Sequence, residues 1–173
     1  MKQNFYLMIF ICCFLFISCN KDDQPIINDK LHENEIVLTD SDFDSLNYVK
    51  RAYVPIYSHI YHGSKGGNIL LTATLSIRNT SFKDTLFVRK IDYYDSHGNL
   101  IKNYINELIL LKPMNALEFI VEEKEDKGGT GANFIVDYGY NSNTLKPLIQ
   151  AVMIGTSGQQ GISFLTQSID ISR

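Results

Sequence analysis

Leu71-Thr72-Ala73-Thr74-Leu75-Ser76-Ile77-Arg78 is the stretch that decides the fold of this 173-residue chain. Apolar residues stand at every second position, and polar residues, two of them β-branched threonines, stand between them. Successive side chains of a β-strand point to opposite faces, so the leucines, alanine and isoleucine share one face. The stretch therefore predicts a strand with one face in a core and the other in water.

Alternation of the same kind recurs along the chain, with turn residues every eight to twelve positions. No segment keeps the i, i+3, i+4, i+7 spacing of an amphipathic helix over eleven residues. We therefore expect an all-β fold of about nine strands, arranged as a two-sheet β-sandwich, with a closed β-barrel as the alternative. The predicted strands are 54–61, 71–78, 85–94, 100–105, 108–111, 117–121, 134–138, 148–154 and 162–165.

Three local features refine this expectation. The alternation slips within 85–94, and a β-bulge near Arg89-Lys90 would restore it by adding one residue. Asp95-Ser96-His97-Gly98-Asn99 predicts a hairpin turn in which Gly98 takes a positive φ and His97 lies at the tip. Pro55 cannot donate to a strand ladder, so we expect it on an edge strand or at a bulge.

The N-terminus has the order of a lipoprotein signal peptide. Lys2 precedes the apolar run Phe5–Ile17, which is too short to span a membrane as a helix, and Ser18 then precedes Cys19. This order resembles a bacterial lipobox, in which the cysteine thiol carries the lipid, palmitate included. The resemblance implies a signal peptide at 1–18 and a lipid on Cys19. The polar, acidic and aperiodic stretch that follows predicts a lipidated flexible tether at 19–47, and the strand pattern predicts a β-sandwich domain at 48–173. An uncleaved membrane anchor is the alternative.

Lys21-Asp22-Asp23 follows the predicted lipidation site. It resembles the surface-export signal of lipoproteins in the Bacteroidetes group, although a solvated polar spacer would look the same. We expect the protein on the bacterial outer membrane, either surface-exposed or facing the periplasm. The membrane, reached through the N-terminal lipid, is the first expected partner.

Charge and cysteine content exclude several classes of function. The formal net charge is −3, and no basic stripe is present, so we expect no nucleic-acid partner. Cys12 and Cys13 lie inside the apolar run, and lipidation would use Cys19. The mature domain would then hold no disulfide, no cysteine nucleophile and no cysteine metal ligand.

Histidine and acidic residues give weak metal signals. His59 and His62 are three apart, so on a strand they face opposite ways and meet one ion only if the chain turns at His62-Gly63. Asp40, Asp42 and Asp44 match the start of a calcium loop, but Ser45 and Arg51 replace the required Gly and Glu. An EF-hand is excluded and a weaker calcium site stays open. We predict no bound metal and no cofactor.

Catalytic patterns are equally weak. Gly155-Thr156-Ser157-Gly158 is not the Gly-x-Ser-x-Gly elbow of hydrolases. Glu122, Glu123, Glu125 and Asp126 are nearly consecutive, which favours one solvated turn over a pair of carboxylates across a cleft. We therefore predict no catalytic residues.

Two glycine-rich loops are the candidate binding surface. The first leads into a predicted buried strand, and it lacks the Lys and the following helix of a phosphate-binding loop. Its glycines are therefore expected to adopt positive φ values. The second, residues 155–161, joins two later strands. Loops at one end of a sandwich form binding surfaces if they lie together. The candidate residues are Gly128, Gly129, Thr130, Gly131 and Asn133 in the first loop, and Ser157, Gln159 and Gln160 in the second.

Two resemblances add to this reading. A strand ending in Arg78-Asn79-Thr80-Ser81, followed by one ending in Asp92-Tyr93-Tyr94-Asp95-Ser96, resembles small immunoglobulin-like domains without their Cys pair and core Trp. The second resemblance rests on five segments, which are 53–61, 71–79, 92–96, 128–136 and 160–164. Through them residues 52–169 resemble a family of small bacterial envelope lipoproteins known only as a domain of unknown function. That resemblance implies location and boundaries and carries no activity.

The leading hypothesis is a lipid-anchored cell-envelope protein that acts as a non-catalytic binding module for an envelope protein or glycan. One alternative is a metal-dependent or hydrolytic enzyme that uses His59, His62 or Asp92 with Asp95. Another is a carrier that holds a small ligand in a cavity between the sheets.

Overall fold

The computed structural model describes residues 40–63, 66–143, 145–157 and 159–172. The predicted signal peptide, Cys19, Lys21-Asp22-Asp23 and most of the predicted tether lie outside the described residues. Among the helices that are described, none has both the length and the apolar character needed to cross a bilayer.

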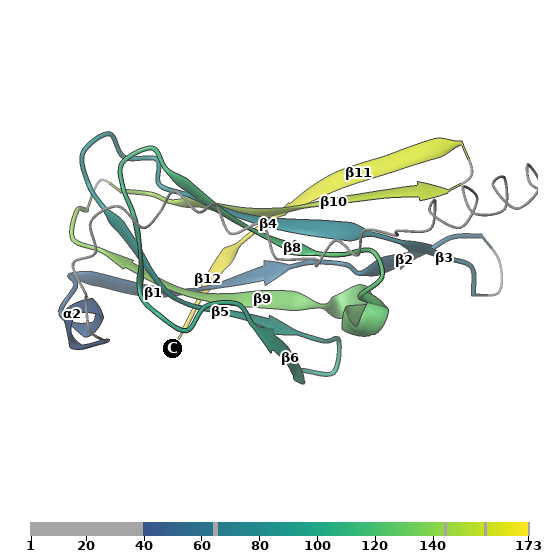
Figure 1. Ribbon diagram of the computed structural model, residues 1–173, viewed down its shortest axis with the longest axis horizontal. Coiled ribbons are helices and arrows are strands. Elements are labelled where there is room, and N and C mark those ends of the chain that lie inside the picture. Colours follow the sequence, from purple (N-terminus) through teal and green to yellow (C-terminus); the bar gives the residue numbers. More distant parts are fainter. Residues whose placement is uncertain (1–39, 64–65, 144, 158, 173) are drawn as a thin grey trace, which may run out of the picture. The chain divides into compact units, whose positions relative to one another are not determined.

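Twelve strands, one short α-helix and one 3-10 helix make up the described part of the chain (Figure 1). The helices are α2 (Asp40–Asp44) and η2 (Asp126–Gly131). The strands are β1 (Tyr48–Pro55), β2 (His59–Tyr61), β3 (Asn68–Leu70), β4 (Thr72–Arg78), β5 (Leu86–Tyr94), β6 (Leu100–Asn103), β7 (Ile109–Leu111), β8 (Ala116–Val121), β9 (Asn133–Tyr140), β10 (Leu148–Ser157), β11 (Gln160–Gln167) and β12 (Ile169–Ile171).

The strands form two open antiparallel sheets and a small hairpin. The six-stranded sheet has the order β12-β1-β9-β5-β6, with β7 also paired to β5, and the four-stranded sheet has the order β11-β10-β4-β8. β2 and β3 form the hairpin. The two sheets face each other, and β1 contacts β10 and β11 across the core (Figure 1). The two-sheet β-sandwich is confirmed and the closed barrel is wrong. The immunoglobulin-like resemblance stays a prediction.

The core lies between the sheets and follows the predicted alternation. Leu71, Ala73, Leu75 and Ile77 are fully buried, as the opening stretch requires. Each fully buried Leu or Ile contributes about 1.5–3 kcal/mol relative to exposure to water. Facing them are residues of the other sheet, such as Val54, Leu86, Val88, Ile91, Phe134 and Val136.

The two predicted irregularities of β5 are confirmed. Its register against β9 shifts between Val88 and Lys90, so Arg89 is the extra residue of a bulge. The turn 95–99 joins β5 to β6, and Gly98 has a φ of 80°. The Asp95 carboxylate accepts hydrogen bonds from the backbone N–H groups of His97 and Asn99, which fixes the turn.

The predicted strand 54–61 is in fact two strands. Between β1 and β2, the N–H of Ile56 donates to the carbonyl of Ala132 and that of Ser58 donates to the carbonyl of Gly129. These bonds draw the chain toward η2 and out of the ladder. Pro55 is not on an edge strand, because β1 lies between β12 and β9. It is the last residue of β1, beyond the residues Arg51–Tyr53 that pair with β12.

Helix α2 begins inside the region predicted as tether. Phe43 is fully buried, and it lies with Leu46 against Gly139, where an added Cβ would overlap the Leu46 side chain. The ordered domain therefore includes residues 40–47. This helix could not be predicted from the sequence, because Phe43 is a single apolar residue in an acidic segment.

Candidate functional site

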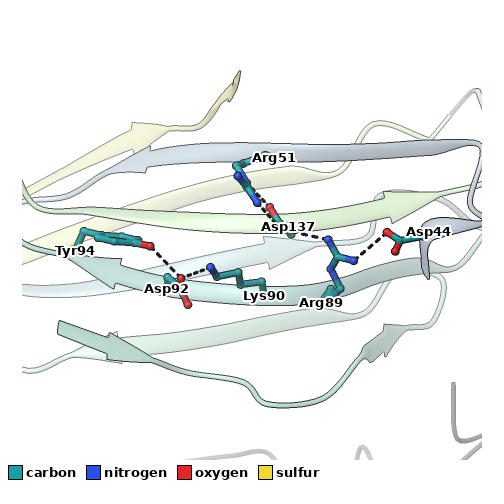
Figure 2. Close-up of polar contacts among 7 residues, drawn as sticks. All are labelled: Asp44, Arg51, Arg89, Lys90, Asp92, Tyr94 and Asp137. Atoms are coloured by element: carbon teal, nitrogen blue, oxygen red, sulfur yellow. Dashed lines mark hydrogen bonds and ion pairs between the residues drawn. The ribbon is translucent and has the colours of Figure 1, made fainter. Parts of the chain in front are cut away.

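The outer face of the six-stranded sheet carries a set of charged side chains. Alternation turns the apolar residues of β1, β9 and β5 inward and the charged ones outward. Arg51 pairs with Asp137 in the β1–β9 register, and Asp137 pairs with Lys90 in the β9–β5 register. Cations and carboxylates from three strands are thus brought into one row across the sheet (Figure 2).

Asp137 lies between two arginines. Arg51 donates to it twice, from Nε to Oδ1 at 2.6 Å and from Nη2 to Oδ2 at 2.8 Å. Arg89 places Nη2 3.6 Å from Oδ2 and donates from Nη1 to Asp44 Oδ1 at 2.9 Å (Figure 2). The ring of Phe43 supports the Arg89 guanidinium at 4.3 Å. Helix α2 therefore helps to fix one cation of the face.

Asp92 is the second carboxylate of this face. It accepts from Lys90 Nζ at 2.6 Å, from the Tyr94 hydroxyl at 3.1 Å and from Asn103 Nδ2 at 3.0 Å. Asp92 and Asp137 are each only 1% exposed, although they lie on the outside of the sheet. Their own partners cover them, and buried charges of this kind are tolerated only when so paired.

The pairing keeps the cations charged. The hydrogen bond to Asp92 raises the pKa of Lys90, and the hydrogen bonds to Asp137 raise the pKa of Arg51. Burial raises the pKa of Tyr94, so its hydroxyl stays protonated and can donate. The face is therefore a fixed array of cations, each held by a carboxylate of the same face.

A depression of about 440 Å³ opens to solvent on this face. The exposed sides of its cations and the amides of its asparagines can donate hydrogen bonds to a carboxylate, a phosphate or a sugar hydroxyl. Its lining residues are Arg89, Lys90, Asn103, Ile105, Asn106 and Asp137.

The first predicted loop has the expected backbone. Gly128, Thr130 and Gly131 belong to η2, Asn133 begins β9, and Gly129 has a φ of 76°. The expectation of a positive-φ glycine before a buried strand is confirmed. Position 128 requires glycine for lack of space, because a Cβ there would overlap the Tyr93 hydroxyl.

The second predicted loop is mostly strand. Ser157 ends β10, Gln160 begins β11 and the two are paired, with Gln159 in the turn. Prediction of a loop over 155–161 was wrong because Thr156 and Gly161 also pair. The hairpin β2–β3 contacts η2 through β2 and β10 through β3, so it stands between the two predicted loops at one end of the sandwich (Figure 1).

A second open depression, of about 480 Å³, lies beside the β10–β11 hairpin. It is separate from the charged face, since its residues come mainly from the four-stranded sheet. They are Thr72, Glu123, Ile154, Gly155, Thr156, Gly161, Ile162 and Ser163.

The histidines of the metal hypothesis lie at a turn. The N–H of His62 donates to Gly67 O at 2.7 Å and Gly63 has a φ of 71°, so the chain does turn there. The His59 ring lies edge-on to Tyr61, with centroids 6.0 Å apart. Throughout the part of the chain that the structure describes, no three His, Cys, Asp or Glu side chains are grouped to hold a metal ion.

The carboxylates of the enzyme hypothesis have separate partners. Asp92 is bound to Lys90, Tyr94 and Asn103, whereas Asp95 accepts from its own turn. Hydrogen bonds to Asn99 lower the pKa of Asp95. The acidic stretch 122–125 forms a turn closed by a bond from the Glu125 N–H to Glu122 O. The prediction of a turn there is confirmed.

Sequence reasoning missed the charged face. Two features of the sequence could have indicated it. Asp137 is a lone charged residue within the apolar run Phe134–Tyr138, and Lys90 and Asp92 stand two apart on one predicted strand. Such residues share the outer face by alternation. Their partners could not be named, because Arg51 is 86 residues from Asp137 and meets it only through the sheet register.

Comparisons with known proteins identify a family without giving an activity. No curated protein matches the chain. The crystal structure of Thermotoga maritima 1070 is similar, with a TM-score of 0.41 and 14% identity, over 72% of this chain and 96% of that one. Residues 49–171 match the family model DUF3124, described as a protein of unknown function. By that match over most of its length, the chain belongs to the DUF3124 family.

Proposed function

We propose that this protein is a lipid-anchored cell-envelope domain that recognises a partner through the charged face of its six-stranded sheet. The charged face comprises Arg51, Arg89, Lys90, Asp92 and Asp137. In this proposal Cys19 carries the lipid that holds the domain on the bacterial outer membrane. The domain binds an envelope protein or glycan that carries anionic groups and leaves it chemically unchanged.

The observation that carries the proposal is the burial of Asp92 and Asp137 on an outer sheet face. A buried ion pair is seldom more stabilising than an apolar pair of similar size, because both charges lose their hydration. Fold stability alone therefore gives little reason for two such carboxylates there. A role in recognition would explain their presence, because the two carboxylates hold Arg51, Arg89 and Lys90 in fixed positions. Preorganised cations lose less entropy when they bind an anionic partner.

The test is photo-crosslinking in intact cells. A photoreactive amino acid replaces Asn106, which is exposed at the rim of the depression. The matched control places it at Gln167, which is exposed on β11 of the other sheet. We expect a defined adduct from position 106 that position 167 does not give.

A second variant ties the adduct to the charged face. Lys90→Gln removes the positive charge and keeps a donor for Asp92, so the fold should survive. We expect this variant to weaken the adduct from position 106 while its circular dichroism spectrum shows that the domain is still folded. Its melting temperature should fall, because Asp92 loses its ion-pair partner. Equal adducts from both positions, or an adduct indifferent to Lys90→Gln, would reject the charged face as the contact surface.

A further inference from the structure

Three loops meet at one end of the sandwich, opposite η2 and the β2–β3 hairpin (Figure 1). They are 79–85 between β4 and β5, 112–115 between β7 and β8, and 141–147 between β9 and β10. We call the exposed residues Phe82, Lys83, Lys112, Met114 and Lys146 of these loops the tip.

One buried asparagine connects two of the loops. Asn79 is 2% exposed, and its Nδ2 donates to the carbonyls of Asp84 at 2.7 Å, Leu111 at 2.9 Å and Lys112 at 3.1 Å. Its own N–H donates to Asn115 O at 2.9 Å. The tip therefore rests on a rigid platform.

The third loop is connected next to Asn79. Thr80 Oγ1 donates to Lys146 O at 2.7 Å, and the N–H of Met114 donates to Ser81 O at 3.1 Å. Segments far apart in sequence thus hold the tip side chains in one place.

The apolar part of the tip is unusually exposed. Phe82 is 82% exposed and Met114 is 58% exposed. Met114 also has a φ of 63°, where a residue with a Cβ is disfavoured and glycine is at ease. It follows Pro113 in a turn closed by Asn115 N–H to Lys112 O. The chain keeps a long apolar side chain where glycine would suit the backbone better, which points to use of that side chain.

Positive charge surrounds these two side chains. Lys83, Lys112 and Lys146 are all exposed, while the one carboxylate of the three loops, Asp84, is engaged by Ser81 Oγ at 3.0 Å. The acidic helix α2 lies at the same end of the sandwich, but it packs against β5 of the six-stranded sheet and its Asp44 is bound by Arg89 (Figure 1). The tip itself combines two exposed apolar side chains with three exposed lysines, which complements an anionic lipid surface.

We propose that the tip docks on an anionic bilayer surface, with Phe82 and Met114 in the headgroup region and the lysines on lipid phosphates. The inference rests on the lipid anchor of the proposed function, because the tether would bring this end to the membrane. Helix α2, which begins at Asp40, lies at the same end as the tip (Figure 1). Twenty residues, 20–39, separate it from Cys19 and reach about 70 Å at full extension.

Docking at the tip turns the rest of the sandwich away from the lipid. The charged face runs along the side of the sandwich, so it stays open to a partner. Each lysine near an anionic surface is expected to strengthen binding about five-fold.

The chain has no tryptophan, which gives a direct test. Phe82→Trp and Tyr61→Trp each add a single fluorophore to the full-length lipidated protein in phosphatidylcholine and phosphatidylglycerol vesicles. Tyr61 is the matched control, 72% exposed near the opposite end of the sandwich. At saturating lipid we expect blue-shifted emission from position 82, quenched by brominated lipid, and neither effect at position 61. Equal emission and quenching at the two positions would overturn the proposal.

Two further variants separate docking from folding. Lys83→Glu with Lys112→Glu and Lys146→Glu should abolish the quenching at position 82 while the circular dichroism spectrum stays the same. Met114→Gly should leave the melting temperature equal or higher, because the backbone strain is relieved, and should still reduce quenching. Full quenching in either variant would contradict the assignment.

The same experiments also test whether the tip binds a protein instead of lipid. Unquenched emission at position 82, with a defined protein crosslinked to that position in cells, would assign the tip to a protein and overturn the lipid proposal. Flotation of the vesicles reports the Cys19 anchor separately. Flotation without quenching rejects the tip alone, and loss of flotation rejects the anchor, whatever position 82 reports.

Discussion

Arg51 and Asp137 stand directly opposite each other on β1 and β9 and form a two-point ion pair, with N–O distances of 2.6 and 2.8 Å. Both contacts link the two strands on the outer surface of the sheet (Figure 2). Charge-assisted bonds of this kind are about twice as strong as neutral ones. The pair therefore adds a side-chain link to a strand junction at the centre of the six-stranded sheet.

Asp137→Asn should lower the free energy of unfolding by about 2–4 kcal/mol, because Arg51 and Arg89 lose their shared carboxylate. Urea denaturation of the purified protein measures the change. Asp44→Asn is the control, since Asp44 is an exposed partner of Arg89 and should cost at most about 1 kcal/mol. Equal losses in the two variants would mean that Asp137 is no more important than a surface charge.

Asn79→Asp should lower the free energy of unfolding by about 2–3 kcal/mol. The carboxylate cannot donate to the carbonyls of Asp84, Leu111 and Lys112, and it would face them with a buried negative charge. In Asn141→Asp the Oδ1 acceptor for the Asn47 N–H is kept, so stability should hold. Thermal unfolding followed by circular dichroism compares the two, and similar melting temperatures would contradict the platform role of Asn79.

Gly128→Ala should destabilise the fold by about 1–3 kcal/mol, because its Cβ would overlap the Tyr93 hydroxyl. Tyr93→Phe removes that hydroxyl, which is buried and without a hydrogen-bond partner among the described residues, so this change alone should be neutral or stabilising. The double variant should recover part of the loss. Gly161→Ala, with open space around it, is the control. Additive single effects in a double-mutant cycle would contradict the predicted overlap.

Stability should fall as the pH rises above about 10, the ordinary tyrosine pKa. Burial raises the pKa of Tyr93 to about 12 and raises that of Tyr138 further, so the unfolded chain loses these protons before the folded one. The hydrogen bond to Asp92 raises the pKa of Lys90, which gives the same sign. Urea midpoints measured from pH 8 to 12 on the wild type and Tyr93→Phe test this. Tyr93→Phe should lose less stability than the wild type over that range. If the urea midpoints of the two proteins fell in parallel with pH, Tyr93 would not contribute to the loss.

Cys19→Ser should abolish metabolic labelling with radioactive palmitate and release the protein from the membrane fraction, because that thiol is the predicted attachment point. Cys12→Ser with Cys13→Ser is the matched control and should retain label, since both residues lie in the apolar run before the cleavage site. Label that persists in Cys19→Ser would place the lipid elsewhere.

The parts of the fold that repeat a local pattern could be predicted from the sequence. Leu71 to Arg78 contains four inward residues in register, and the bulge at Arg89 is visible as a single slip of phase. These signals need only neighbouring residues, because strand alternation is a property of the local backbone. The turn at 95–99 was readable for the same reason, since Asp95 and Gly98 have specific turn roles.

The parts that depend on distant partners could not be predicted. β3 and β12 have three residues each, too few to display a period. Phe43 is buried near Gly139, a residue far along the chain that only the folded sheet brings to it. The charged face needs the register of β1, β9 and β5 together, and the platform under the tip needs three loops that only the complete sandwich brings to Asn79.

The position of β1 between β9 and β12 has a consequence for folding. Tyr53 pairs with Ile135 on one side and with Ile169 on the other, so both of its partners lie more than 80 residues away along the chain. Pairings of such separation make folding slow, in the range of milliseconds to seconds. Until residues 169–171 join the sheet, β1 keeps an open edge along Arg51–Tyr53. An open strand edge can pair with another chain, so the three residues of β12 protect the sheet from such pairing.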